Sequence, residues 1–235
     1  MSPTACDLIG AVLAPALPVL VVTGVGREAK IAANREVATI CSGGAPERLR
    51  EMLAARPQPD CRAVISFGVA GGLEPNLRPG DIVLATKVVA NGREWLADSA
   101  LTALLGAELL KDAKLRTVMA PLAGVDVALI CATSKRTAFE GCGASAVDME
   151  SHIAAEYAER HGLPFAALRV VCDPAGRGLP PLIASALRPD GSVSLAGVLG
   201  SVLRRPAQVF GLPRLAYDAR LAFRALGRCG GALPA

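Results

Sequence analysis

The sequence predicts one α/β domain of three layers, in which helices cover both faces of a mixed, largely parallel central sheet. Apolar runs of strand length alternate along the chain with segments whose apolar residues recur at helical spacing. Several of the strand-like runs end in glycines, which indicate turns or loops after the strands. The length of 235 residues and the 52% of hydrophobic residues suit a domain with a sizeable core. We expect the main domain over residues 1–187 and a basic, amphipathic helical extension over 188–235 that packs on it.

The first half of the chain is expected to alternate between strands and helices. Residues 19–23 form a β-branched run before a glycine turn at 24–26, which predicts a buried strand. In the segment 45–56, Leu49, Met52 and Leu53 recur at helical spacing. The expected strands are 19–23, 37–44, 63–73 and 80–89, and the expected helices are 27–37 and 45–56.

The second half continues the same alternation. Residues 149–161 place Ile153, Ala154 and Tyr157 on one helical face, and Gly162 and Pro164 end that helix. A buried strand follows and runs into an acidic residue. The expected helices are 99–110 and 149–161, and the expected strands are 115–123, 125–133 and 165–173.

Composition excludes several classes of protein. Five Phe, two Tyr and one Trp leave little aromatic surface for stacking on bases, so we expect no nucleic-acid partner. The seven cysteines contain no CxxC pair and are accompanied by only two histidines, so neither a zinc site nor a disulfide framework is expected. The uncharged run 8–26 approaches the length of a membrane span, but Pro15 and Pro18 interrupt it. We therefore expect reduced thiols and a cytoplasmic protein.

Positive charge gathers at the end of the chain. From Ala186 onward seven arginines face only Asp190 and Asp218, which gives this segment a net charge of +5 within a total of +4. On a helical wheel one apolar stripe contains Leu212, Leu215, Ala216, Ala219, Ala222, Phe223 and Leu226. Arg214, Arg220, Arg224 and Arg228 fall on the opposite side. Two interpretations stay open: a docked helix with a solvated cationic face, or a surface that rests on anionic lipid headgroups at the inner face of the membrane.

Polar residues and glycines gather where four predicted strands end. Ligands of open α/β sheets bind outside the carboxyl ends of strands, so these residues are candidates for a site. Each has a simpler explanation: the glycines form turns, Asp148 caps the helix that follows, and Arg27 and Glu28 are solvated. The candidates are Arg27 and Glu28, then Gly68, Gly71 and Gly72, then Asp148 and Glu150, and last Arg169 and Asp173.

Arg169 is the residue that a purely structural interpretation explains least well. It lies inside an apolar strand, where a guanidinium needs a carboxylate partner to offset the loss of water. The sequence offers Glu28, Glu150 and Asp173 as partners. An acidic cluster around one buried arginine is a setting in which carboxyl groups are tuned for proton transfer.

Two segments carry a resemblance to a known family. FGVAGGLEPNLRPGDIVLATKVV at 67–89 and AVDMESHIAAEYAERHGLPFAALRVVCDPA at 146–175 resemble the nucleoside phosphorylase-I superfamily. That superfamily includes purine and uridine phosphorylases and the methylthioadenosine/S-adenosylhomocysteine nucleosidases. The resemblance covers roughly residues 18–185, and the basic segment after Arg188 looks like the branch of hopanoid-associated phosphorylases.

The resemblance implies a role for each matching residue. Asp173 matches the acid that protonates or hydrogen-bonds N7 of the purine, and its pKa is expected to be raised by burial. Met149 matches the residue that packs on the ribose, and Glu150 the carboxylate that accepts the 2′- and 3′-hydroxyls. Arg169 matches the arginine that orients the acidic groups, and Glu28 the carboxylate that activates water. Asp148 is counted with the substrate-binding residues.

The nucleophile is implied to lie at the backbone of Val69, Ala70 and Gly71, with Arg27 placed to bind phosphate. Members of the family commonly have a serine where this chain has Val69. Phosphorolysis and hydrolysis therefore both remain open, with inorganic phosphate as a co-substrate in the first case. The resemblance implies no metal and no organic cofactor.

The expected function is cleavage of the N-glycosidic bond of an adenosine-type nucleoside. The branch points to release of adenine from adenosylhopane, a lipid-linked nucleoside of hopanoid biosynthesis. One alternative is a nucleosidase that acts on small soluble nucleosides such as methylthioadenosine. A second, from another class, is a non-catalytic protein that binds nucleosides or lipids. The resemblance also implies a homo-oligomer.

Overall fold

The structure is a computed structural model that describes residues 17–34, 36–178 and 212–233. The expected boundary between the main domain and its extension, at residue 188, lies outside these residues. The N-terminal part of the uncharged run also lies outside them. Among the helices of the described residues, none is both long and apolar enough to cross a membrane.

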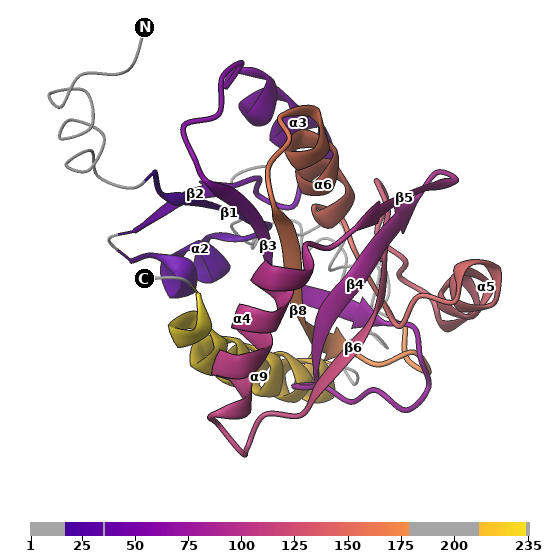
Figure 1. Cartoon of the computed structure of the whole chain (residues 1–235). Helices are drawn as coiled ribbons and strands as arrows, with labels where there is room; N and C mark the ends of the chain where they lie inside the picture. Colours follow the sequence, from indigo (N-terminus) through magenta and orange to yellow (C-terminus); the bar gives the residue numbers. More distant parts are fainter. Residues whose placement is uncertain (1–16, 35, 179–211, 234–235) are drawn as a thin grey trace, which may run out of the picture.

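One mixed sheet forms the centre of the molecule (Figure 1). Its strands are β1 Val19–Thr23, β2 Val37–Cys41, β3 Ala63–Gly72, β4 Ile82–Ala90, β5 Arg93–Leu96, β6 Thr117–Gly124, β7 Ala146–Asp148 and β8 Phe165–Asp173. The order is β2-β1-β3-β7-β6-β4-β5, and β8 pairs with both β3 and β4. The pairs β1–β2, β1–β3, β3–β8, β4–β6 and β6–β7 are parallel, whereas β3–β7, β4–β5 and β4–β8 are antiparallel. The predicted α/β fold with a mixed, largely parallel sheet is confirmed.

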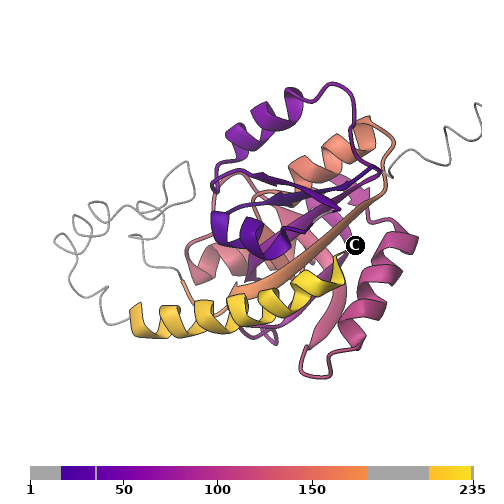
Figure 2. The same ribbon diagram turned by 90° about the vertical axis from the view of Figure 1, so that its left-hand side faces the viewer.

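Helices cover the sheet on both sides (Figures 1 and 2). They are α2 Gly26–Ala32, α3 Pro46–Ala54, α4 Ser99–Leu110, α5 Ala132–Cys142, α6 Ser151–Arg160 and α9 Leu212–Cys229. Side chains of α3 and α6 belong to one buried apolar cluster, and those of α2, α4 and α9 to another. β1 contributes to both, since Leu20 and Val22 face the first cluster and Val19 and Val21 the second. Burial on both faces explains why this strand is a continuous apolar run.

The end of β3 brings several strand ends together. β3 pairs in parallel with β8 until a register shift between Ala70 and Gly71, after which Gly71 lies opposite Asp173. Gly71 and the next residue, Gly72, also pair in antiparallel fashion with β7. The bulge therefore places the last residues of β3 beside the last residues of β7 and β8.

The strand predicted over 125–133 is wrong. After β6 the backbone N–H of Val125 donates to the Asp148 carbonyl at 2.9 Å, and the chain then leaves the sheet. Helix α5 begins at Ala132 and was not predicted. Cys131 accepts a hydrogen bond from Ser134 N at its start, and Gly143 ends it at φ 64°. Although the apolar residues of this segment alternate, it pairs with no strand among the described residues.

Helix α9 packs on the sheet through a face that differs slightly from the predicted stripe. Ala222 and Leu226 are fully buried, as expected, whereas Ala216 is exposed. Asp218 is buried despite its charge. Leu212, Leu215, Ala219 and Phe223 are half-buried. An ion pair with Arg177, in the turn after β8, accounts for the buried aspartate.

Candidate active site

Arg169 stands in the middle of β8 with its side chain fully removed from solvent. Its Nε lies 2.9 Å from Oδ2 of Asp148, and its Nη1 lies 3.2 Å from Oε2 of Glu150. Of the three partners that the sequence offered, Glu150 is confirmed. Asp148 was not among them, and Asp173 is instead paired with another cation. Two carboxylates thus compensate the buried guanidinium, which alone would cost several kcal/mol of desolvation.

Two serines complete the polar surroundings of Arg169. Its Nη2 donates to Oγ of Ser66, and its Nε lies 3.3 Å from Oγ of Ser151. Ser151 Oγ in turn donates its proton to the carboxylate of Asp148 and lies 3.0 Å from Ser66 Oγ. Neither serine was predicted, because a lone serine in an apolar strand or at a helix start carries no distinctive spacing. The network fixes the plane of the guanidinium.

The carboxylate of Asp148 holds the turn that leads into helix α6, close to the capping role that the simpler interpretation predicted, although the N-cap itself is Glu150. Its Oδ1 accepts from the backbone N–H of Glu150 at 3.0 Å and of Ser151 at 2.7 Å. These two hydrogen bonds fix Met149, which is half-buried, and Glu150 just before the first helical residue, Ser151. Burial raises the pKa of Glu150 to about 7, although Arg169 opposes the shift.

Glu28 is a buried carboxylate held by backbone amides. Its Oε2 accepts from the N–H of Gly24 at 2.7 Å and of Val25 at 2.9 Å, and its Oε1 accepts from the N–H of Val69 at 2.8 Å. Burial raises the pKa of Glu28, and the charge of Arg169 acts in the opposite direction. The carboxylate therefore connects Gly24 and Val25, which follow β1, to Val69 in the second half of β3.

Two glycines allow these charged groups to approach the backbone. A Cβ at Gly68 would lie 2.6 Å from Cδ of Glu28 and 2.8 Å from Nη1 of Arg169. A Cβ at Gly24 would lie 2.8 Å from Oε1 of Glu150. Real Cβ atoms do not come this close to other atoms, so the site requires glycine at both positions.

Asp173 ends β8 and forms an ion pair with Lys135 of α5, which the sequence did not reveal. The carboxylate oxygen Oδ2 accepts from Nζ of Lys135. Burial raises the pKa of Asp173, in the expected direction, while Lys135 opposes the rise. Asp173 also lies close to Gly71, whose Cβ would be 3.4 Å from Oδ2.

Arg27 does not join this group. Its side chain is exposed, and its guanidinium carbon lies 4.2 Å from the centre of the Phe223 ring on α9. The predicted residues that do come together are Glu28, Asp148, Glu150 and Arg169, with the backbone of Val69. Ala70 and Gly71 continue from there to Asp173 along β3.

A second polar cluster lies beside α6. Oδ1 of Asp126 is 2.6 Å from Nη2 of Arg50 and 3.0 Å from Nε2 of His152. The buried Nδ1 of His152 has no hydrogen-bond partner among the residues that the structure describes. Its ring packs on the backbone of Gly124, where a Cβ would lie 2.6 Å from Nδ1. These residues support the start of α6 rather than extend the acidic cluster.

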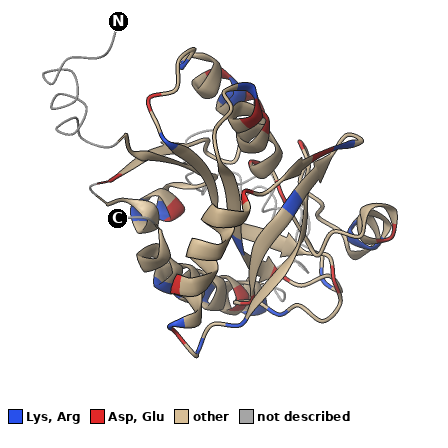
Figure 3. Cartoon of the chain, viewed as in Figure 1, with Lys and Arg blue, Asp and Glu red and all other residues tan. Residues whose placement is uncertain are grey.

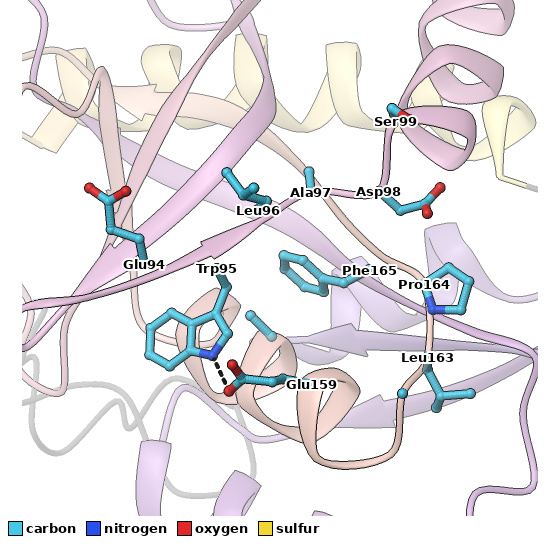
Figure 4. Close-up of a pocket in the computed structure, with 12 residues that line it drawn as sticks. Glu94, Trp95, Leu96, Ala97, Asp98, Ser99, Glu159, Leu163, Pro164 and Phe165 are labelled. Atoms are coloured by element: carbon cyan, nitrogen blue, oxygen red, sulfur yellow. Dashed lines mark hydrogen bonds between the residues drawn. The ribbon is translucent and has the colours of Figure 1, made fainter.

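The hollow drawn in Figure 4 lies at the opposite end of β8, about 25 Å from Asp173 at the usual rise per residue. It has a volume of about 750 Å³ and is lined by Trp95, Glu159 and Phe165 among others. The indole of Trp95 donates to Glu159 at 2.9 Å across it. The residues that line the hollow do not include Arg169 or the carboxylates around it, so the hollow is separate from the candidate site.

The site therefore combines a buried guanidinium, carboxyl groups with raised pKa values and glycines that admit them, all at the meeting point of β1, β3, β7 and β8. The fold that holds this site is that of enzymes of the nucleoside phosphorylase and nucleosidase type. The chain belongs to the phosphorylase superfamily, whose sequence profile matches residues 14–184. Among curated proteins, none matches the chain in sequence.

Solved structures are similar to it in fold. A 5′-methylthioadenosine/S-adenosylhomocysteine nucleosidase of Helicobacter pylori, with butyl-thio-DADMe-Immucillin-A, is 16% identical with a TM-score of 0.64, over 80% of this chain and 99% of that one. The futalosine hydrolase of Helicobacter pylori is 17% identical with a TM-score of 0.62, over 80% and 98%. A nucleosidase of Colwellia psychrerythraea in complex with adenine is 15% identical with a TM-score of 0.62, over 91% and 96%.

Proposed function

We propose that the protein cleaves the N-glycosidic bond of an adenosine-type nucleoside and releases adenine. The observation that carries the proposal is the buried Asp173 carboxyl, whose raised pKa lets it hold a proton at a higher pH than an exposed aspartate does. A proton or hydrogen bond given to N7 makes the purine a better leaving group. The buried Glu150 and Glu28 follow the ends of β7 and β1, and the buried Arg169 of β8 contacts Glu150.

The proposed reaction assigns a separate task to each residue. As the bond between C1′ and the base breaks, its electron pair leaves with the purine and positive charge develops on the ribose. The proton of Asp173 moves to N7 of the purine. Glu150 accepts the 2′- and 3′-hydroxyls, and Met149 packs against the ribose. Arg169 keeps the carboxylate of Glu150 in place through its contact at 3.2 Å.

We infer that water is the nucleophile. Val69 has no hydroxyl, and its backbone N–H already donates to Glu28. Arg27 stacks on Phe223 instead of facing the cluster. A carboxylate offers about four acceptor positions, and Glu28 uses three of them on backbone amides. The fourth can take a proton from water, and the raised pKa of Glu28 makes it a stronger base. This step uses no metal and no organic cofactor.

We propose adenosylhopane as the substrate, which would place the enzyme in hopanoid biosynthesis in the cytoplasm. The resemblance of the basic segment after Arg188 supports this. Helix α9 carries charges of both signs (Figure 3), but its exposed Arg220 and Arg224 form no ion pair with any other described residue. Tyr217 is exposed on the same helix. Such a face can rest on anionic lipid headgroups next to a lipid-linked nucleoside.

A nucleosidase that acts on small soluble nucleosides is the second candidate. The similarity in fold to methylthioadenosine/S-adenosylhomocysteine nucleosidases favours it. Mass spectrometry of the products from adenosylhopane and from methylthioadenosine, each with and without inorganic phosphate, distinguishes the two. We expect adenine and an unphosphorylated sugar from adenosylhopane, and little product from methylthioadenosine.

The other outcomes of this experiment have defined meanings. A sugar phosphate that forms only with phosphate present would replace water by phosphate as the nucleophile. Faster release from methylthioadenosine would favour the second candidate. A protein that binds nucleosides but releases adenine from none of them would be a binding protein, and the proposal would be wrong.

Contact with the membrane needs its own test. The full chain should float with anionic liposomes, less so at high salt, and a chain that ends at Arg188 should not float. Full-length protein that never floats would contradict the lipid contact and leave the adenine-release assay unaffected.

We also propose a homo-oligomer, because Leu96, Leu104, Leu110 and Met119 are large apolar side chains exposed on the surface. Sedimentation at several concentrations would detect it.

A further inference from the structure

We propose that Lys135 is the positioning residue of the base site, which sets both the orientation and the charge of Asp173. The proposal rests on the proposed function in one respect only, that Asp173 acts on the leaving base. Lys135 does not belong to the group of residues around Arg169. Its side chain extends from α5 and contacts the carboxylate of Asp173.

Lys135 is the feature of this region that packing alone explains least. Its side chain has no exposed surface, although an ammonium group loses strong hydration on burial. The Nζ atom contacts the carboxylate of Asp173 and the carbonyl oxygens of Asp173 at 3.3 Å, Pro174 at 3.1 Å and Arg177 at 3.2 Å. An ammonium has three protons to donate, so these acceptors replace its water completely.

The geometry makes Lys135 a clamp for the turn that follows β8. Three carbonyls of one turn converge on a single Nζ, so the backbone from Asp173 to Arg177 is wrapped around the ammonium. The same Nζ also holds one oxygen of the Asp173 carboxylate. The other oxygen, Oδ1, is left for the substrate. The clamp therefore decides in which direction the carboxyl points.

The opposite side of this turn is held by α9. The guanidinium of Arg177 is paired with the buried carboxylate of Asp218, while the carbonyl of Arg177 accepts from Lys135. The turn is tight against the start of α5 as well, since a Cβ at Gly178 would lie 2.8 Å from the Ile130 carbonyl oxygen. With both sides of the turn fixed, Asp173 has little freedom to move when a base enters or leaves.

Lys135 also determines the charge balance at Asp173. The charged groups that face this carboxyl are Lys135 from α5, Arg177 from its own turn and Asp218 from α9. The neighbouring thiol of Cys172, with its pKa raised to about 12, stays neutral. Burial raises the pKa of Asp173, Lys135 is the strongest opposing influence, and Arg177 and Asp218 act in opposite directions. Removal of the lysine charge should therefore raise the pKa of Asp173 further.

The first experiment measures Asp173 itself and needs no substrate. Carbon-13 NMR of labelled aspartate carboxyls, with the Asp173 signal assigned by its loss in Asp173→Asn, gives the titration midpoint in the folded full chain. In Lys135→Met the midpoint should rise by about 1–3 pH units, the usual effect of an opposite charge in contact. Lys111→Met, which removes an exposed lysine 2.6 Å from Glu108, should leave it unchanged. An equal midpoint in Lys135→Met and wild type would overturn the proposal.

The second experiment separates orientation from charge with Lys135→Arg, which also serves if Lys135→Met does not fold. The guanidinium keeps the positive charge, but its N–H groups lie in a planar fork. They therefore cannot replace the single Nζ on which the three carbonyls converge. We expect the midpoint of Asp173 to stay near its wild-type value, and kcat for adenine release to fall about 10-fold or more. Wild-type kcat in Lys135→Arg would overturn the orientation role, and a shifted midpoint would overturn the charge role.

These outcomes can be told apart from a failure of the proposed function. If the wild-type protein releases adenine from no nucleoside, the proposed function is wrong, and the NMR titration still decides whether Lys135 controls Asp173. If the wild type is active, the alkaline limb of its kcat/KM profile should follow the NMR midpoint and move upward in Lys135→Met. An alkaline limb that stays in place while the midpoint moves would overturn the link between Lys135 and the reaction.

Discussion

The guanidinium of Arg169 lies 3.2 Å from the carboxylate of Glu150, yet the pKa of Glu150 is raised to about 7. Burial is the larger influence, because both side chains are almost completely removed from water. The charges of Asp148 and Glu28 act in the same direction as burial. The charge of Arg169 thus acts on three buried carboxyl groups, and the pKa of one of them, Glu150, lies close to neutral pH.

The first prediction concerns the pH dependence of stability that Glu150 causes. The pKa of Glu150 is raised from 4.5 to about 7 in the folded protein. Its contribution to the free energy of unfolding is therefore fully present below pH 4.5 and is lost as the pH rises through 7. The difference in unfolding free energy between wild type and Glu150→Gln should fall by on the order of 3 kcal/mol between pH 4.5 and 8. Urea unfolding over this range measures it. Glu108→Gln, at a partly exposed site, is the control, and an equal pH dependence in both variants would contradict the assignment.

The second prediction concerns Arg169 as the shared counter-charge. Arg169→Met leaves Asp148 and Glu150 buried without a cation, and this should cost about 3–5 kcal/mol of unfolding free energy. Arg160→Met is a matched control, because Arg160 is largely exposed and its contact with Glu156 is 3.6 Å. Chemical denaturation of both variants at pH 8 compares the losses. Similar losses would mean that the buried cluster is neutralised in another way.

The third prediction tests the acid assigned to the leaving base. An amide cannot supply a proton, so Asp173→Asn should lower kcat for adenine release by about 10²–10⁴-fold. The amide oxygen can still accept from Lys135, so the fold should survive, as circular dichroism would report. Asp60→Asn, at an exposed surface pair with Arg56, should keep full activity. Near-normal turnover in Asp173→Asn would remove this residue from the mechanism.

Much of the fold and of the acidic cluster could be predicted from the sequence. Strand β8 is a continuous apolar run interrupted by Arg169, and a buried arginine must find carboxylates nearby. Asp148 and Glu150 stand beside a helix start, where capping fixes their geometry. These inferences depend on neighbours in sequence or on one strong physical requirement, and such features can be recognised without the fold.

What was missed depends on contacts between distant segments. A lysine in a helix is usually solvated, and only the path of the turn after β8 shows that Lys135 is buried against Asp173. Helix α5 was not predicted either, because the strand expected over 125–133 ends where the helix begins, at Ala132. The strand β5 could have been predicted from Asn91 and Gly92, whose φ values of 50° and 75° form a tight hairpin turn with β4.

The fourth prediction tests whether the approach of Glu28 and Arg169 to one glycine is required. In Gly68→Ala the new Cβ would lie 2.6 Å from Glu28 Cδ and 2.8 Å from Arg169 Nη1, so these groups must move apart. Glu28 would then lose its hydrogen bond from Val69, and kcat should fall at least about 10² with a stability loss of about 1–3 kcal/mol. Gly141→Ala on α5, where nothing lies within 4 Å, should keep full activity and gain up to about 1 kcal/mol. Activity assays and thermal unfolding of both variants decide the matter, and equal behaviour would show that Gly68 is not essential to the site.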